Sequence, residues 1–263
     1  MGPVPVLMYH HVNKHKGDMV TVVPEVFERQ MRYLNKAGYR TLRADELLSY
    51  IKGDLSFDGK VVMITFDDGW LDNYVYAFPV LRKYNINATI FIATDWIKEG
   101  FDNISDLNSH IHKHREARRL IEQGEAYKAI LNWKLIREMS ESGLVEFYSH
   151  TKSHRKASSM SEDELSEELQ KSKQTIEKKL SKDCSYLCWP FGSYNETAVK
   201  IARATGYKAV FTTQPGVVKK DSDPFTLRRI VVKDSQLWFM KSMIIYSSSL
   251  LSRCYIYMKG VRK

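Results

Sequence analysis

Short apolar segments recur along this chain of 263 residues, and their spacing constrains the fold more than any other feature of the sequence. Most of them are separated by stretches of helical periodicity, and strands that alternate with helices favour a parallel sheet. About eight such strands in one chain indicate an α/β fold with a closed or nearly closed barrel. The expected strands are residues 4–9, 39–42, 61–66, 88–93, 145–149, 185–189, 209–212 and 226–232.

Two of the intervening segments carry clear helix signals. Residues 161–180 begin with Ser161 and Glu164 in the positions of a capping box, and leucine and isoleucine then keep one face apolar. Residues 195–206 begin with Asn195 as the expected N-cap and end at a glycine.

The barrel is expected to occupy residues 1–232, because no internal repeat and no linker rich in Pro or Gly marks a second domain. Residues 101 to about 130 are polar and rich in His and Arg, which indicates an insertion between two barrel units. Residues 233–263 are apolar, aromatic and basic, and they are expected to form an amphipathic C-terminal tail. This tail either packs on the barrel as a closing helix or lies on a membrane surface near anionic headgroups.

The composition limits which partners and which cellular compartment are expected. A formal net charge of +9 favours polyanionic partners, but no nucleic-acid-binding motif is present, so nucleic acid is not expected. Three cysteines at irregular spacing predict reduced thiols rather than a disulfide framework. The N-terminus lacks the pattern of a signal peptide, and no apolar run is long enough for a transmembrane helix. We therefore expect a cytoplasmic protein, with peripheral contact to the inner membrane face as an option.

Two neighbouring acids, Asp67 and Asp68, follow the apolar run at residues 61–66. Barrel enzymes place their chemistry at the C-terminal ends of the strands. Adjacent carboxylates near a cleft repel each other unless a proton or a cation neutralises one of them. The pair therefore predicts a bound metal ion.

A second strand, at residues 145–149, is followed by His150 and His154 in the segment "HTKSH". Two imidazoles and one carboxylate give three protein ligands and leave a position open, which is the pattern of a catalytic zinc site. Iron, cobalt and nickel accept the same ligands, so the expected cofactor is Zn²⁺ or one of these metals.

Five segments together resemble the polysaccharide deacetylases, the NodB-homology or carbohydrate esterase 4 family, in the subgroup with an N-terminal MYH motif. They are "MYHHV", "TFDDG", "SHTKSH", "WPFGSYN" and "LRRIVV". The resemblance covers about residues 4–232 apart from the insertion. It implies a distorted (β/α) barrel, usually of seven strands, and metal-dependent hydrolysis of an N-acyl group, typically N-acetyl, from an amino sugar.

Carried to this chain, the resemblance implies that Asp67 is the general base and that Asp68, His150 and His154 are the metal ligands. The metal would acidify a water molecule and polarise the amide carbonyl, and Asp67 would take the proton of the attacking water.

The third motif, "WPFGSYN", is expected to hold the developing oxyanion through the backbone N–H of Phe191. Pro190 would fix the turn there, and Gly192 would let the backbone approach closely. Tyr194 completes the expected oxyanion and substrate-binding set.

Two features depart from the family pattern. The arginine that often braces the catalytic base is replaced in this region by Cys188 and Trp189, so the bracing of Asp67 must come from elsewhere or be weaker. The late strand also lacks the histidine that would protonate the leaving amine. We assign that role to His10, with Asp45 and Asp72 as weaker alternatives; His11 should point away from the site.

The segment "HIHKHREARR" in the insertion holds three alternating histidines, His110, His112 and His114. A second metal site is one interpretation. A basic lid is favoured, because alternation along a helix spreads the three rings over different faces. Such a lid could contact an anionic substrate, for example a lipid pyrophosphate.

The sequence thus predicts a metal-dependent N-deacetylase that acts on an amino-sugar glycan of the cell surface or on its lipid-linked precursor. The alternative is a catalytically impaired glycan-binding protein that keeps the deacetylase fold. A phosphatase of the haloacid dehalogenase type is disfavoured, because its second Asp would fall at the position of Gly69.

Overall fold

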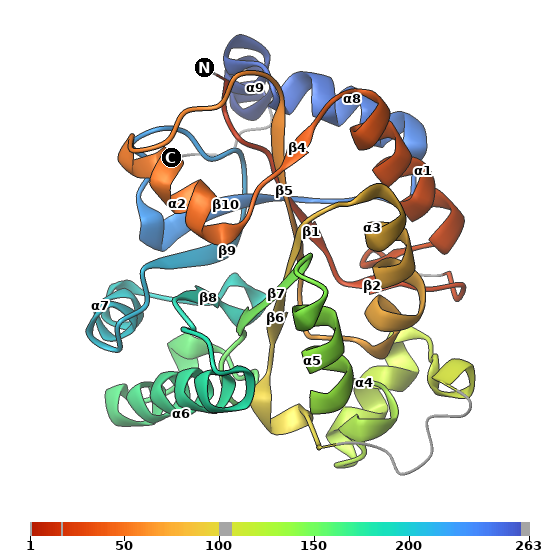
Figure 1. Ribbon diagram of the computed structural model, residues 1–263. Coiled ribbons are helices and arrows are strands. Elements are labelled where there is room, and N and C mark those ends of the chain that lie inside the picture. Colours follow the sequence, from red (N-terminus) through yellow and green to blue (C-terminus); the bar gives the residue numbers. More distant parts are fainter. Residues whose placement is uncertain (1, 17, 100–106, 259–263) are drawn as a thin grey trace.

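A computed structural model describes residues 2–16, 18–99 and 107–258. Within these residues, seven parallel strands follow one another around a barrel in chain order, and the last pairs with the first to close it (Figure 1). The predicted fold class is confirmed. The strands of the ring are β1 (Val6–Tyr9), β5 (Val61–Phe66), β6 (Ala88–Ile92), β7 (Val145–Ser149), β8 (Tyr186–Cys188), β9 (Ala209–Pro215) and β10 (Leu227–Val231).

The strand expected at residues 39–42 forms, but it is not part of the ring. This strand, β4 (Arg40–Thr41), pairs with the first two residues of β5, on the same edge where β6 pairs with the last two. One edge of β5 is therefore shared between two neighbours, which distorts the barrel and leaves seven strands in it. A separate pair of very short strands, β2 (His11–Val12) and β3 (Thr21–Val22), lies outside the sequence prediction.

Helices surround the ring of strands (Figure 1). The two helix predictions are confirmed, including the capping box of Ser161 with Glu164 and the N-cap bond from Ala198 N to Asn195 Oδ1. The helices are α1 (Pro24–Lys36), α2 (Ala44–Lys52), α3 (Phe78–Tyr84), α4 (His114–Glu122), α5 (Trp133–Glu141), α6 (Glu162–Leu180), α7 (Glu196–Ala204), α8 (Gln236–Tyr246) and α9 (Ser249–Met258).

The described part of the insertion is fixed to the loop that follows β5. Leu71 N donates to Ala129 O at 2.9 Å, and Leu131 N donates to Gly69 O at 2.9 Å. Helix α4 therefore sits at the carboxyl end of the barrel. Residues 100–106 of the predicted insertion lie outside the described residues.

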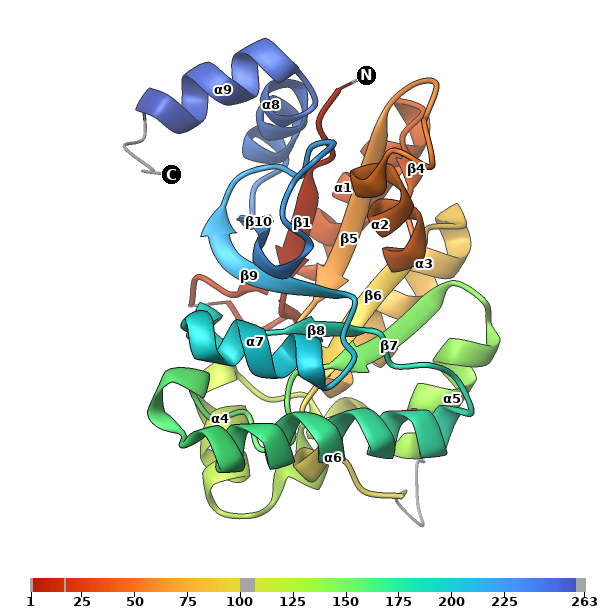
Figure 2. The ribbon, with the colours of Figure 1, turned by 90° about the vertical axis from the view of Figure 1, so that its left-hand side faces the viewer.

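The tail forms two helices at the opposite end of the molecule from α4 (Figures 1 and 2). Helix α8 buries Phe239, Met243 and Tyr246, so it packs on the barrel, and α9 extends away from it. The predicted tail residues 259–263 lie outside the described part. None of the described helices is both long enough and apolar enough to span a membrane.

Candidate functional site

The two acids lie in a tight turn at the end of β5. Asp68 has a φ of 76° and Gly69 has a φ of 75°. A Cβ atom at Gly69 would lie 2.8 Å from Cγ2 of Ile92, so glycine is required for both conformation and space. This turn separates the environments of Asp67 and Asp68, although the residues are adjacent.

Asp68 faces the two histidines that follow β7. Its Oδ1 lies 3.0 Å from Nε2 of His154 and 3.4 Å from Nε2 of His150. Trp70 donates its indole N–H to the other oxygen, Oδ2, at 3.0 Å. All three metal-ligating groups are buried, and their ligand atoms lie within 4.8 Å of one another. The structure therefore brings together the three ligands expected from the sequence.

This cluster fits a divalent cation. Oδ1 of Asp68 is buried and, among the described residues, accepts no hydrogen bond. Nδ1 of His150 lies 2.8 Å from the carbonyl oxygen of Cys188, which can only accept, so Nδ1 carries a proton and Nε2 is the atom directed at Asp68 that a cation could bind. Burial alone would raise the pKa of Asp68, but His150 and His154 hold that pKa well below its usual value.

Asp67 is held by an arginine that the sequence prediction missed. Arg229, on β10, donates from Nη1 to Oδ1 and from Nη2 to Oδ2, both at 2.7 Å. The guanidinium is fully buried and also bonds Thr65 Oγ1 and Thr212 O. Burial raises the pKa of Asp67, but the charge of Arg229 outweighs it and the pKa is lowered. The missing brace is thus supplied by a different strand, and the paired arginines in "LRRIVV" were the available signal.

A second group that could ligate a metal, Asp67 with His150 and Cys188, fits a cation poorly. Nη2 of Arg229 lies 2.9 Å from Sγ of Cys188 and 2.7 Å from Asp67. The guanidinium therefore already supplies the positive charge in this group.

His10 follows β1 and reaches the same side of the site as Asp67. Its Nε2 lies 3.9 Å from Asp67 Oδ2, and its side chain is 21% exposed. Burial lowers the pKa of His10, which leaves the imidazole neutral near pH 7. The weaker candidates are engaged elsewhere: Asp45 accepts a hydrogen bond from Tyr186, and Asp72 accepts one from His11.

His11 lies behind the site rather than in it. Its Nδ1 is 2.6 Å from Asp72 Oδ2, and its Nε2 is 3.0 Å from Nδ1 of His114 on α4. The His11 ring stacks on Trp70 with a centroid separation of 4.2 Å. This buried network supports the indole that holds Asp68, and it also anchors the insertion.

The histidines of the insertion do not share a helix, contrary to the sequence prediction. His110 lies in a 3₁₀ turn, His112 lies in the connection that follows, and only His114 is in α4. His112 faces Glu116 at 3.4 Å. Within the described residues, the groups able to ligate a metal gather only around Asp67 and Asp68.

The third motif forms the rim of the site next to His154. Phe191 has a φ of 58°, and its side chain, 55% exposed, lies with its ring 4.8 Å from the ring of His154. Pro190 starts this turn. A Cβ atom at Gly192 would lie 1.9 Å from Oγ1 of Thr213, so a glycine is required there for the packing of this turn. Tyr194 lies further along the rim and accepts a hydrogen bond from Gln214 at 2.8 Å.

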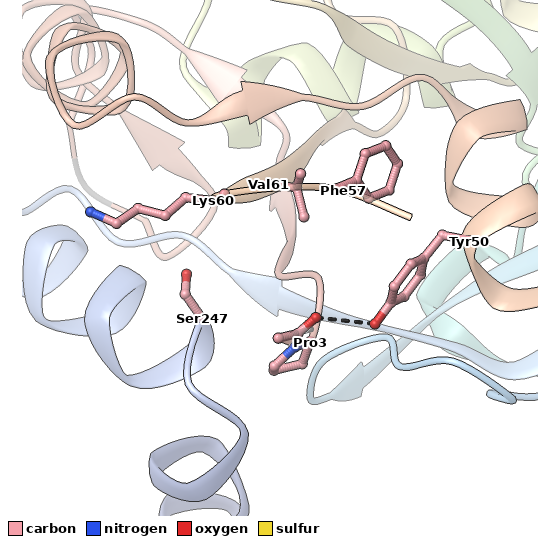
Figure 3. A pocket seen from close by; sticks show the side chains of 8 residues that line it. Pro3, Tyr50, Phe57, Lys60, Val61 and Ser247 are labelled. Carbon is pink, nitrogen blue, oxygen red and sulfur yellow. Dashed lines mark hydrogen bonds between the residues drawn. The ribbon is translucent and has the colours of Figure 1, made fainter. Parts of the chain in front are cut away.

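A small hollow of about 80 Å³ lies at the other end of the barrel, beside the starts of β1 and β5 (Figure 3). Tyr50 donates to the carbonyl of Gly2 at 3.1 Å there. Its lining holds neither acid nor histidine, so this hollow offers no metal site of the kind found at the carboxyl end.

Comparison with known proteins identifies relatives of this arrangement. Residues 54–210, more than half of the chain, match the family model described as polysaccharide deacetylase. The match includes the acid pair, the two histidines and Phe191, whereas His10 and Arg229 lie outside it.

Two curated relatives align over most of the chain. "Putative polysaccharide deacetylase YxkH" of Bacillus subtilis is 31% identical over 229 residues, which are 87% of this chain and 71% of the relative. The poly-β-1,6-N-acetyl-D-glucosamine N-deacetylase of Staphylococcus epidermidis is 30% identical over 224 residues, 81% of this chain and 68% of the relative. Among solved structures, the Streptococcus pyogenes deacetylase PplD in complex with acetate superposes with a TM-score of 0.76 at 27% identity, covering 92% of this chain and 98% of that one.

Proposed function

Because the chain belongs to the polysaccharide deacetylase family, we propose that it is a metal-dependent hydrolase that removes an N-acyl group, namely acetyl, from an amino sugar. Its substrate is a cell-surface glycan or the lipid-linked precursor of one. The observation that carries this proposal is the division between two adjacent carboxylates. Asp68 faces two histidines, and Asp67 is held by Arg229.

Asp68, His150 and His154 hold the cation, with zinc as the first choice and iron, cobalt or nickel as substitutes. A cation bound there supplies Lewis acidity, which activates a water molecule and stabilises negative charge on the acyl oxygen. Trp70 and the carbonyl of Cys188 orient the ligands, as outer partners do in metal sites.

Asp67 acts as the general base. Both of its oxygens bond Arg229, so the carboxylate is ionised and fixed in orientation when substrate arrives. It takes a proton from the water that attacks the acyl carbon, and the backbone N–H of Phe191 donates to the oxygen that becomes negative. Pro190 and Tyr194 shape the rim against which the sugar packs.

His10 completes the proton balance. A neutral imidazole is too weak an acid to protonate the amine, so His10 first receives the proton that Asp67 has taken, once the 3.9 Å between the two groups shortens to hydrogen-bond distance in the substrate complex. It then passes the proton to the amine as the C–N bond breaks. The products are a carboxylic acid and a free amino sugar.

The alternative is a glycan-binding protein with an impaired site. The cluster of Asp68 with two histidines, and the ion pair of Asp67 with Arg229, support hydrolysis over glycan binding alone. The names of the relatives, which include N-deacetylases of a glycan, support the catalytic proposal.

The test combines metal analysis of the purified protein with acetate release from N-acetylated oligosaccharides by wild type and by Asp67→Asn. We expect about one bound metal per chain, and we expect the variant to lose 10²–10⁴ of the rate while keeping its metal. A chelator should abolish acetate release, and added metal should restore it. Full metal occupancy without acyl release would favour the glycan-binding alternative, and a protein that binds no divalent metal would disprove the mechanism.

The tail supports a second element of the proposal, peripheral contact with an anionic membrane. Leu237, Met240 and Ile244 recur at helical spacing on the side of α8 opposite its buried face, and all three are exposed. Helices α8 and α9 contain Lys241 and Arg253 but no acidic residue. Apolar exposure together with positive charge is the combination that binds anionic lipid surfaces.

This contact would lie at the end of the molecule opposite α4, so the mouth of the barrel would face away from the bilayer. Such an orientation suits a polymer or the distal sugars of a lipid-linked saccharide. We place the protein in the cytoplasm at the inner membrane face, in keeping with its free cysteines.

The membrane proposal is tested by sedimentation with vesicles of phosphatidylglycerol or phosphatidylcholine. Wild type should bind the anionic vesicles, and Leu237→Ser with Ile244→Ser should release it. Met19→Ser is the matched control, because Met19 is 90% exposed but lies far from the tail in sequence. Equal partition of wild type and the double variant, or localisation unaffected by tail deletion in cell fractions, would disprove membrane contact.

A further inference from the structure

The ring of His154 lies between two aromatic side chains at the rim of the site. The ring centroid of Trp96 is 4.7 Å from that of His154, and the centroid of Phe191 is 4.8 Å from it. Trp96 follows β6 and Phe191 follows β8. Two loops of the barrel therefore converge on one metal-ligating residue.

Each aromatic ring carries a cation on its face. Cζ of Arg118 lies 5.7 Å from the ring centroid of Trp96, and Nζ of Lys156 lies 5.7 Å from that of Phe191. Arg118 comes from α4 of the insertion, and Lys156 comes from the loop after β7. Two positive charges from separate parts of the chain thus flank the site.

Neither cation is neutralised within the described part of the chain. No carboxylate forms an ion pair with Arg118 or Lys156 there, whereas Arg155, the neighbour of Lys156, pairs with Glu164 at 3.3 Å. Glu116, two residues before Arg118, faces His112 at 3.4 Å, and Asp95, the neighbour of Trp96, pairs with Lys152 at 3.2 Å. The two charges are therefore available to a ligand.

The acids of the site do not neutralise Arg118 or Lys156 either. Asp67 is neutralised by Arg229, and Asp68 faces two histidines. A neutral sugar could stack on the exposed ring of Phe191, but it would gain nothing from the two cations. An anionic group beside the reacting sugar would be attracted by both charges and could accept a charge-assisted hydrogen bond from either side chain.

We propose that Arg118 and Lys156 form an anion subsite and that the glycan carries a carboxylate or phosphate next to the N-acylated sugar. This inference rests on the proposed function, because the subsite flanks the same metal ligand. It adds one property that family membership does not give, namely a negative charge on the substrate next to the N-acylated sugar.

The test compares kcat/KM for acyl release from three oligosaccharides of equal length built on N-acetylglucosamine. One is neutral, one carries carboxylates through lactyl ethers, and one carries a phosphate diester. Wild type should prefer at least one anionic substrate, and that preference should weaken as the salt concentration rises. Preference for the carboxylate or for the phosphate separates the two sources of charge.

The variants are Arg118→Gln and Lys156→Gln, which keep part of each side-chain stem over its aromatic ring. Each should lower kcat/KM for the preferred anion about tenfold, the usual effect of losing one charge-assisted contact. The ratio of kcat/KM for the preferred anion to kcat/KM for the neutral oligosaccharide should therefore fall in each variant. The matched controls are the sequence neighbours Arg119→Gln and Arg155→Gln, which should leave the preference intact.

Binding measurements separate this inference from the proposed function. Calorimetric titration of the same oligosaccharides into Asp67→Asn reports the subsite without catalysis. Anion preference that disappears with Arg118→Gln and Lys156→Gln upholds the subsite, even if wild type releases no acyl group and the proposed hydrolysis fails. Equal affinity for neutral and anionic oligosaccharides, unchanged by both substitutions, would overturn it even if deacetylation is found.

Discussion

The two ends of the barrel reach left-handed backbone conformations in different ways. At the carboxyl end, positive φ angles occur at Gly69 and Gly192 but also at four residues that carry side chains: Asp68, Thr151, His154 and Phe191. At the amino end, where helices return to strands, they occur mainly at glycines that end helices. A glycine at a helix end adopts this conformation at little cost, whereas a residue with a Cβ atom stores strain. The positive φ angles at the carboxyl end therefore lower the stability of the fold at residues that belong to the candidate site.

The largest effect is expected from Arg229→Gln. Removing one member of a buried ion pair leaves Asp67 uncompensated and should cost about 3–5 kcal/mol of unfolding free energy. Denaturant unfolding of the metal-free protein measures this cost. Arg228→Gln, on the same strand, should change stability by less than about 0.5 kcal/mol.

A double variant makes this test sharper. Arg229→Met with Asp67→Leu removes both charges, and replacing a buried pair with apolar residues is often neutral for stability. We expect this variant to recover most of the lost stability without recovering acyl release. A double variant as unstable as Arg229→Gln would mean that the arginine acts through its contacts with Thr65 and Thr212, and not through Asp67.

Arg229 should also control the pH dependence of the base. In wild type the pKa of Asp67 is lowered, so its contribution to stability is complete above the unfolded value near 3.9 and is lost as pH falls through the folded value. With Arg229→Gln, burial prevails and raises the folded pKa, so ionisation of Asp67 should then destabilise the protein as pH rises. The acid limb of the rate profile should move to higher pH. If the acid limb does not move, it reports the titration of a group other than Asp67.

Glycine substitutions probe the two ends directly. Gly192→Ala at the carboxyl end brings a Cβ atom to 1.9 Å from Thr213 Oγ1 and should cost about 3 kcal/mol. Gly38→Ala near the amino end meets no atom within 4 Å and should cost only the left-handed conformation, roughly 1 kcal/mol. Thermal unfolding of both variants measures the difference. Equal costs would show that the loop of Gly192 relaxes freely.

The fold was largely predictable because each strand is a local apolar signal. The strand pattern alone indicated about eight strands, and the family resemblance implied the seven that the ring contains; the pattern could not show that β4 and β6 share one edge of β5, because this depends on contacts between distant segments. The cluster of Asp68, His150 and His154 was predictable because all three lie in the segments that follow two strands, β5 and β7. Arg229 was not, because its role arises only when barrel closure brings β10 within reach of Asp67. The support of Trp70 by His11 likewise joins segments that the sequence pattern does not relate.

The smallest predicted effect concerns that support. Trp70→Phe removes the donor to Asp68 Oδ2 but keeps an aromatic ring, and it should weaken metal binding about tenfold. Competition with a chromophoric chelator measures this affinity independently of catalysis. Trp189→Phe is the matched control, because the buried Nε1 of Trp189 makes no hydrogen bond among the described residues. If both variants weaken metal binding equally, the loss reflects packing of the indole at the carboxyl end; if only Trp70→Phe does, the hydrogen bond orients the carboxylate.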